Sequence, residues 1–257
     1  MYATMIAGVA ALIFLFLGMI FFLEIGRRLR LRSKADDKLT SGLSVVEGAL
    51  FGLMGLVIAF TFSGAASRFD ERRQLIVEEA NDIGTAYMRL DLLPSAAQPA
   101  IRDLVRRYVD TRIQTYRVLP DYDAALAEIS KANDLQREIW NAAVAATRDD
   151  TKPQAAIVLL PALNEMFDIA NTRFWATQIH PPVMIYVLLG ILALVCALLA
   201  GFGMAGGPSR SWIHIVGFSL ILTLAVYVII DMEYPRMGFI RVDSFDQALI
   251  DVRASMK

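Results

Sequence analysis

The chain has 257 residues, of which 56% are hydrophobic and only 20% are charged, and its formal net charge at pH 7 is -1. This composition is too apolar for an ordinary soluble domain, and the balanced charge excludes a protein that binds nucleic acid through a broad basic face. The single cysteine, Cys196, excludes an intramolecular disulfide framework.

The first predicted element is a membrane span over residues 5–23, a run without a charged side chain. Its apolar core is longer than that of a secretory signal peptide, and no basic region precedes it. We therefore expect it to remain in the mature chain as a transmembrane helix.

The loop after the first span is dense in basic residues, which are Arg27, Arg28, Arg30, Arg32, Lys34 and Lys38. The positive-inside rule then predicts a cytoplasmic loop and a periplasmic position for the large polar segment of the chain. The number of basic residues near span ends on the other side of the membrane almost equals the number in this loop. Only the close spacing of the basic residues in the loop therefore decides the predicted orientation. We expect Arg27, Arg28, Arg30 and Arg32 to contact anionic lipid head groups.

The second span, residues 48–67, is uncharged and long enough to cross a hydrocarbon core of about 30 Å as a helix. No turn residue separates it from the charged segment that follows, so one helix should leave the bilayer and continue in water. Apolar residues of that segment keep a near-heptad spacing, at Phe69, Ile76, Ala80, Ile83, Tyr87 and Leu90. This apolar stripe requires a packing partner.

Small residues recur along one face of the second span at intervals of four and three. They are Gly48, Gly52, Gly55, Ala59, Ser63 and Ala66. Such a face permits the close approach of helix backbones, a main source of helix association in lipid. Two interpretations stay open. The face packs against another span of the same subunit, or copies of the helix surround a symmetry axis with Leu56 and Phe60 facing that axis.

Residues 68–180 are predicted to form an all-helical extramembrane domain. No glycine occurs between Thr85 and Leu189, and four prolines divide the segment into helix-length pieces. Apolar stripes with helical spacing occur at Ile101, Leu104, Val105 and Tyr108, and at Ala132, Leu135, Ile139, Ala142 and Ala146. Pro161 predicts that its helix starts nearby or bends there.

Residues 182–203 and 211–230 are the third and fourth predicted spans. Between them lies the run GFGMAGG, whose glycines at 201, 203 and 206 we expect at a helix end and a tight turn. A dinucleotide-binding loop is excluded there, because a membrane span and not a strand precedes the run. The acids that follow the fourth span, Asp231, Glu233, Asp243 and Asp246, are expected in salt bridges and caps.

The predicted architecture is an all-α integral membrane protein with four transmembrane helices and a helical extramembrane bundle. Four segments divide the chain. Residues 1–67 contain the first two spans and the basic loop, and residues 68–180 form the extramembrane domain. Residues 181–231 contain the last two spans, and residues 232–257 form a tail that packs on the extramembrane domain.

A resemblance begins at the junction after the second span. A pattern found in bestrophins occurs at matching spacing in Phe60, Arg68, Glu71, Arg73 and Leu75. Longer stretches also match, namely GTAYMRLDLLP, LLPALNEMFDI and EYPRMGFIRVDSFDQAL. On these residues the chain resembles the bacterial bestrophin-like domain family, which is distantly similar to bestrophin anion channels, nearly from end to end. It departs from the pattern at Thr61, where an arginine is expected, and at Asp70, where an aromatic residue is expected.

The resemblance implies a homo-oligomeric ring, such as a pentamer, with an axial pore that is lined by the second span and passes small anions. It implies that Gly52, Leu56 and Phe60 line this pore, one helical turn apart. Gly52 departs from the bulky apolar residue of the pattern, which implies a wider pore at that level or another register. Bestrophins have the opposite membrane orientation to the one predicted here from basic residues.

Charged residues at the ends of the second span are candidates for the mouth of such a pore. Glu47 precedes the span, and Arg68, Glu71 and Arg73 follow it. Rings of charge can select ions by sign. The alternative is that Glu47 lies at the membrane interface and that the other three form ion pairs between neighbouring helices.

The resemblance therefore implies a homo-oligomeric ion channel, whereas composition and periodicity establish only the membrane class. The alternative is a non-conducting membrane scaffold or sensor whose helical domain binds a partner. No nucleophile elbow, phosphate loop or zinc spacing occurs, so neither an enzyme nor a cofactor is expected. His180 and His214 fall at opposite ends of the hairpin of the last two spans, so no metal site is expected either.

Overall fold

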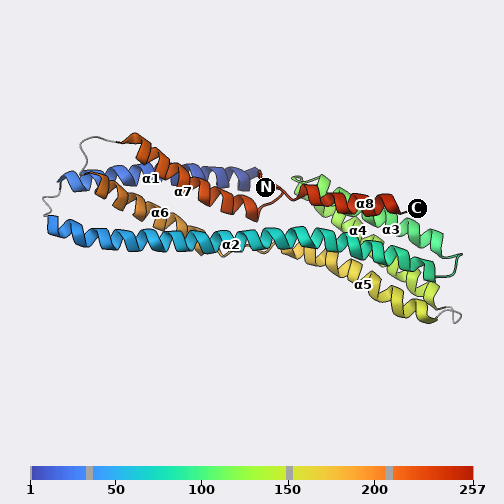
Figure 1. Cartoon of the computed structure of the whole chain (residues 1–257). Helices are drawn as coiled ribbons and strands as arrows, with labels where there is room; N and C mark the ends of the chain where they lie inside the picture. Colours follow the sequence, from blue (N-terminus) through green and yellow to red (C-terminus); the bar gives the residue numbers. More distant parts are fainter. Residues whose placement is uncertain (1, 33–36, 149–152, 206–210, 257) are drawn as a thin grey trace. The chain divides into compact units, whose positions relative to one another are not determined.

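The computed structural model describes residues 2–32, 37–148, 153–205 and 211–256, and their side chains within 8–32, 44–148, 154–205 and 211–256. In these residues all regular elements are helices, and none is a strand (Figure 1). In chain order they are α1 (Tyr2–Arg32), α2 (Asp37–Arg89), η1 (Leu90–Leu92), α3 (Gln98–Arg117), α4 (Tyr122–Thr147), α5 (Pro153–Ala176), α6 (Val183–Met204), α7 (Trp212–Glu233), η2 (Asp243–Asp246) and α8 (Gln247–Ser255). The predicted all-α class is confirmed.

Four described helices are long and apolar enough to cross a membrane, namely α1, α2, α6 and α7. These are the helices that contain the predicted spans. The second of them, α2, is one helix of 53 residues that continues without interruption from the apolar segment into the charged one. The expected continuous helix is confirmed, since no proline or loop-forming run lies at the junction.

The chain divides into two compact units. Unit 1 comprises Met1–Arg68 and His180–Tyr234, and unit 2 comprises Phe69–Ile179 and Pro235–Lys257. The first part of α2 belongs to unit 1 and the rest to unit 2.

In unit 1, α1 packs closely on α6, and glycines set this approach. A methyl group added at Gly26 would lie 1.9 Å from the carbonyl oxygen of Leu198, and one at Gly201 would lie 2.0 Å from that of Leu23. Any side chain at either position would force the helices apart. Gly201 and Gly203 lie in the last turn of α6, at the helix end that the sequence predicted, and Gly201 also serves helix packing. Gly206 lies outside the described residues.

The apolar core of unit 1 joins α1, α2, α6 and α7. It contains Met19, Leu23, Met54, Leu192, Ala193, Cys196, Ala197 and Ile215. Helix α2 enters this core through Met54, and its Phe51 ring meets that of Phe218 edge-on at 6.0 Å between centroids. One side of α2 is thus held by the other spans of the same subunit.

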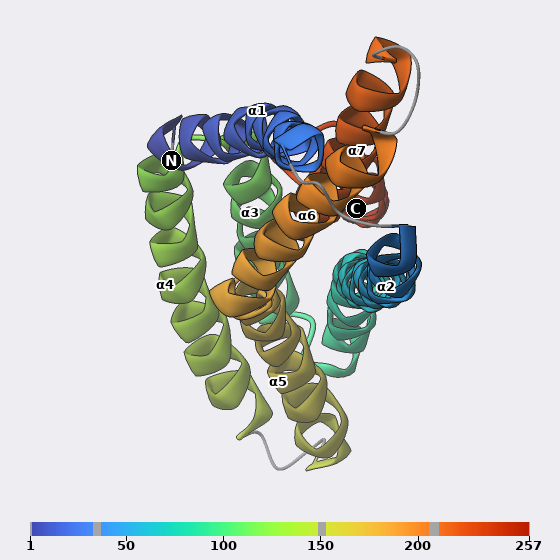
Figure 2. The same ribbon diagram turned by 90° about the vertical axis from the view of Figure 1, so that its left-hand side faces the viewer.

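Unit 2 is a helical bundle in which α4 lies beside α3 and α5 (Figure 2), and α8 packs on α3. Its core includes Ile83 of α2, Tyr108 of α3, Ile139 of α4, Met166 of α5 and Leu249 of α8. Most residues of the predicted apolar stripes are buried, because each helix turns its periodic apolar face to the shared core. Leu104, Ala142 and Ala146 pack against that core but are only partly buried.

Pro161 lies inside α5, so the expectation that a helix starts near it is wrong. The proline removes one backbone hydrogen bond from the helix. The neighbouring side chains of Leu159, Ala162 and Leu163 are almost completely buried in the core. This burial explains why the helix continues through the proline.

Candidate functional site

The face of α2 that carries the predicted small and pore-lining residues is open in the subunit. Leu56 and Phe60 are 52% and 70% exposed. A methyl group added at Gly48, Gly52 or Gly55 would meet no described atom within 4 Å. The remaining small residues of this face are Ala59 and Ser63, which are exposed, and Ala66, which is half-buried.

The opposite face of α2 is buried in the subunit. Met54, Thr61 and Ala65 have exposures of 5%, 9% and 0%. The hydroxyl of Thr61 donates a hydrogen bond to the carbonyl oxygen of Val57, 2.6 Å away, so it is satisfied within its own helix. Helix α2 therefore has one side packed in the subunit and one side free of contact with the described parts of the same chain.

Glu47 lies at the end of α2 that approaches α6. A methyl group added at Gly203 would lie 3.5 Å from Oε1 of Glu47. Glu47 is half-buried. Its carboxylate therefore faces the end of α6 in the subunit.

Arg68 joins α2 to the end of α7. Its Nε donates a hydrogen bond to Oε1 of Glu233 at 2.9 Å, and an Nη of the same guanidinium also contacts that oxygen. The other carboxylate oxygen of Glu233 lies 3.4 Å from Nδ1 of His180, whose ring stacks on Tyr234 at 4.6 Å. Glu233 is only 1% exposed, so Arg68 supplies the counter-charge that its burial requires.

Glu71 and Arg73 lie on the part of α2 in unit 2. Glu71 is exposed. The Nη1 of Arg73 donates a hydrogen bond to Oδ1 of Asp70 at 2.8 Å within the same helix. The guanidinium of Arg73 also lies over the ring of Phe245, 4.4 Å from its centroid. Arg73 therefore attaches the C-terminal segment to α2.

A buried ion-pair cluster, which the sequence reasoning missed, lies inside unit 2. The carboxylate of Glu79 on α2 binds Arg112 of α3 at 2.5 Å and also binds Arg173 of α5. These three residues are at most 4% exposed. The guanidinium groups of Arg112, Arg173 and Arg236 all lie within 5.5 Å of the ring centroid of Tyr116. The cluster ties three helices and the C-terminal segment together through charge.

Electrostatics fix the protonation states near this cluster. Burial opposes the charge of Arg112, but the adjacent Glu79 carboxylate outweighs it and raises the pKa of Arg112 well above its usual range. Burial raises the pKa of Tyr108 to about 12, although the hydrogen bond from Gln136 to its hydroxyl acts in the opposite direction. Near neutral pH the arginine is charged and the tyrosine is neutral.

Arg72 is a buried arginine whose structural role the sequence pattern did not reveal. It is 7% exposed, and its guanidinium donates hydrogen bonds to the carbonyl oxygens of Ala176, at 3.1 Å, and Ile179, at 2.9 Å. These carbonyls belong to the end of α5 and the segment after it, where a helix leaves acceptors unsatisfied. Arg72 therefore caps α5.

The predicted lipid-binding arginines lie at the end of α1. Arg27 and Arg28 approach Glu24 at 3.9 and 2.8 Å, and Arg30 lies over the ring of Phe202. Arg32 is exposed. Lys34 and the side chain of Lys38 lie outside the described residues. Contact of these arginines with lipid head groups stays a prediction.

The acids after α7 form ion pairs, as the sequence predicted. Asp246 accepts hydrogen bonds from Arg236 at 2.7 and 2.8 Å, and Asp243 accepts one from Arg241 at 2.5 Å. Within the described residues, no group of three or more His, Cys, Asp or Glu side chains is placed to hold a metal ion.

Comparisons with known proteins agree with this fold. A model of the Bestrophin-like domain matches residues 9–245 of the chain. Two crystal structures of mutants of a bacterial bestrophin homolog from Klebsiella pneumoniae are similar. One has a TM-score of 0.66 at 16% identity and covers 96% of this chain and 98% of its own. The other has a TM-score of 0.60 at 17% identity and covers 95% and 99%. No curated protein matches this chain in sequence.

Proposed function

Because this chain belongs to the Bestrophin-like domain family, we propose that it is a homo-oligomeric ion channel whose axial pore is lined by α2. The observation that supports this proposal best is the open face of α2. A glycine-rich face in a transmembrane helix gains stability only when another helix packs closely on it. No described part of the same subunit does so, which favours packing between copies of the chain.

The two large apolar side chains beside the small-residue face suggest how such a pore would be controlled. Leu56 and Phe60 point away from the packed side of α2 and are more than half exposed. In a ring of subunits they would form apolar constrictions, which can close a pore by expelling water. Gly52, one turn before Leu56, would leave a wider level in the same pore.

The ring is proposed to be a pentamer that passes small anions, as the resemblance to bestrophins implies. Glu47 faces the end of α6 in its own subunit, which favours its alternative place at the membrane interface; a ring of carboxylates at the pore mouth would also oppose the entry of anions. At the other end, Arg68 is engaged by the buried Glu233, which favours a structural ion pair over contact with a permeating ion. We place the protein in the bacterial inner membrane with unit 2 in the periplasm, on the basis of the basic cluster after α1.

Ion flux in liposomes tests the proposal. The Leu56→Ala, Phe60→Ala double variant should widen and wet the constriction, so its flux should exceed that of the wild type. Phe14→Ala is the matched control, since Phe14 is also an exposed phenylalanine of a membrane span, at 76%, but lies on α1 and not on α2. Its flux should equal that of the wild type.

Chloride, potassium and sodium gradients are applied to each variant, with the intact oligomer verified in the same samples. Flux in no variant under any gradient would contradict the channel and favour the non-conducting scaffold or sensor. Equal gains in flux for Phe14→Ala and the double variant would contradict the proposed pore face.

A further inference from the structure

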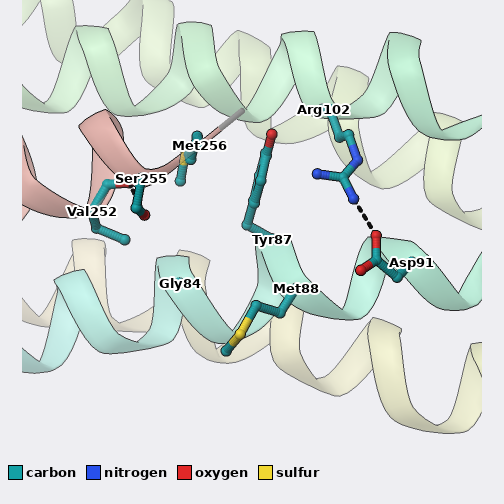
Figure 3. Close-up of a pocket in the computed structure, with 8 residues that line it drawn as sticks. All are labelled: Gly84, Tyr87, Met88, Asp91, Arg102, Val252, Ser255 and Met256. Carbon is teal, nitrogen blue, oxygen red and sulfur yellow. Dashed lines mark hydrogen bonds and ion pairs between the residues drawn. The ribbon is translucent and has the colours of Figure 1, made fainter.

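A pocket of about 400 Å³ lies within unit 2, between α2, α3 and α8 (Figure 3). This volume falls in the range of small-molecule sites. Gly84 allows α8 to approach α2 here, because a methyl group at this position would lie only 3.3 Å from Cγ2 of Val252. The pocket thus joins segments that are far apart in the sequence.

One part of the pocket is apolar. Its walls include the ring of Tyr87 and the side chains of Met88 and Met256. Met88 is 67% exposed, whereas Met256 and Tyr87 are 6% and 7% exposed. Methionine side chains are flexible and polarisable, so they adapt to apolar ligands of varied shape.

The other part of the pocket carries a positioned cation. The guanidinium of Arg102 lies over the ring of Tyr87, 4.8 Å from its centroid, and forms an ion pair with Asp91. The hydroxyl of Tyr87 also accepts a hydrogen bond from Nη1 of Arg106 at 3.3 Å, which holds the ring in place. Hydrogen bonding to Tyr87 raises the pKa of Arg102, so the group remains charged.

The two partners of this ion pair differ in exposure. The side chain of Arg102 is 22% exposed, but that of Asp91 is 67% exposed. An ion pair with so exposed a carboxylate contributes little to stability, and Asp91 can turn into water at low cost. An incoming carboxylate could then occupy the fork of the guanidinium, which suits two parallel hydrogen bonds.

We propose that this pocket binds a small organic carboxylate, with its charged group on Arg102 and its apolar body against Tyr87, Met88 and Met256. An organic cation would be repelled by Arg102 and could pair only with Asp91, whose carboxylate is largely exposed to water and therefore attracts it weakly. A neutral apolar molecule would contact the same apolar side chains but would gain no binding energy from the guanidinium.

Binding of 4-phenylbutyrate to the full-length chain, measured by calorimetry in detergent or in nanodiscs, tests the proposal. The neutral amide of this probe and 4-phenylbutylamine have the same apolar body without the negative charge. We expect saturable binding of the carboxylate and at least about tenfold weaker binding of the amide, the effect of losing a hydrogen bond between charged groups. The amine should not bind.

Arg102→Gln should weaken carboxylate binding by about tenfold or more, whereas Arg107→Gln, an exposed arginine of the same helix, should leave it unchanged. Met88→Ala should weaken the binding of carboxylate and amide alike, since it removes only apolar contact. Absence of saturable carboxylate binding, or equal affinity in wild type and Arg102→Gln, would overturn the proposal. The assay needs no ion flux, so its failure and a failure of the channel proposal are distinguishable.

Discussion

Replacing Glu79 by glutamine tests whether the buried ion-pair cluster holds unit 2 together. Glutamine keeps the volume of the side chain and can still accept a hydrogen bond, but it removes the negative charge. Arg112 and Arg173 are each only 4% exposed, so water cannot replace that charge. Arg173 has a second carboxylate, that of Asp246, at 3.8 Å. Arg112 donates its other described hydrogen bond to the hydroxyl of Tyr116, which carries no charge. Most of the loss in stability therefore comes from the guanidinium of Arg112, which is left without a counter-charge.

Removing one partner of a buried ion pair costs about 3 to 5 kcal/mol, because the remaining charge is buried without compensation. For a protein of this size, each kcal/mol lowers the melting temperature by roughly 2 to 4 °C, so Glu79→Gln should lower it by about 10 °C. Thermal or urea unfolding can be followed by the fluorescence of Trp140, which packs against the core of unit 2, in a background where the other two tryptophans, Trp175 and Trp212, are replaced by phenylalanine.

Glu78→Gln is the matched control, because Glu78 precedes Glu79 on the same helix but is exposed. It should change the free energy of unfolding by no more than about 0.5 kcal/mol. The Glu79→Gln, Arg112→Gln double variant should lose less stability than the sum of the single variants, since the two side chains contact each other directly. If Glu79→Gln melts at the same temperature as Glu78→Gln, the cluster does not stabilise the bundle and this reasoning is refuted.

Three other predictions follow from the structure and the sequence. Gly55→Leu should dissociate the oligomer in native mass spectrometry by separating helices at the open face of α2, and an unchanged oligomer would contradict that interface. The pKa of Tyr108 is raised to about 12 in the folded state, from an unfolded value near 10. The titration of this hydroxyl therefore leaves the free energy of unfolding unchanged below pH 10 and lowers it by about 3 kcal/mol as the pH rises from 10 through 12. Tyr108→Phe should remove this fall, as measured by unfolding at different pH values. In a Cys196→Ala background, a cysteine at Ser33, which lies outside the described residues, should be shielded from an impermeant thiol reagent in intact cells, while one at the exposed Ala127 is labelled. The reverse labelling would show the opposite orientation.

The sequence alone determined the helices and their class. A span is recognised by the length of its uncharged run, and a bundle helix by the period of its apolar residues, and both are local properties of the chain. The continuity of α2 followed from the absence of a turn at the junction, and its buried positions at Ile76 and Ile83 followed from the near-heptad spacing. The matched motifs pointed to the family for the same reason, since they lie in continuous stretches.

The contacts between helices were decided only by the tertiary structure. The small residues on the open face of α2 and the glycines at 26 and 201 look alike in sequence, yet the latter two lie directly against the backbone of another helix of the same subunit, whereas Gly48, Gly52 and Gly55 meet no described atom. Arg68 and Glu233 are 165 positions apart, and Glu79 meets Arg112 and Arg173 from two other helices. A helical period shows which face of a helix is apolar but not which helix covers it. The pairing of buried charges depends on that choice, because a charge can be buried only where packing brings its partner within a few ångströms.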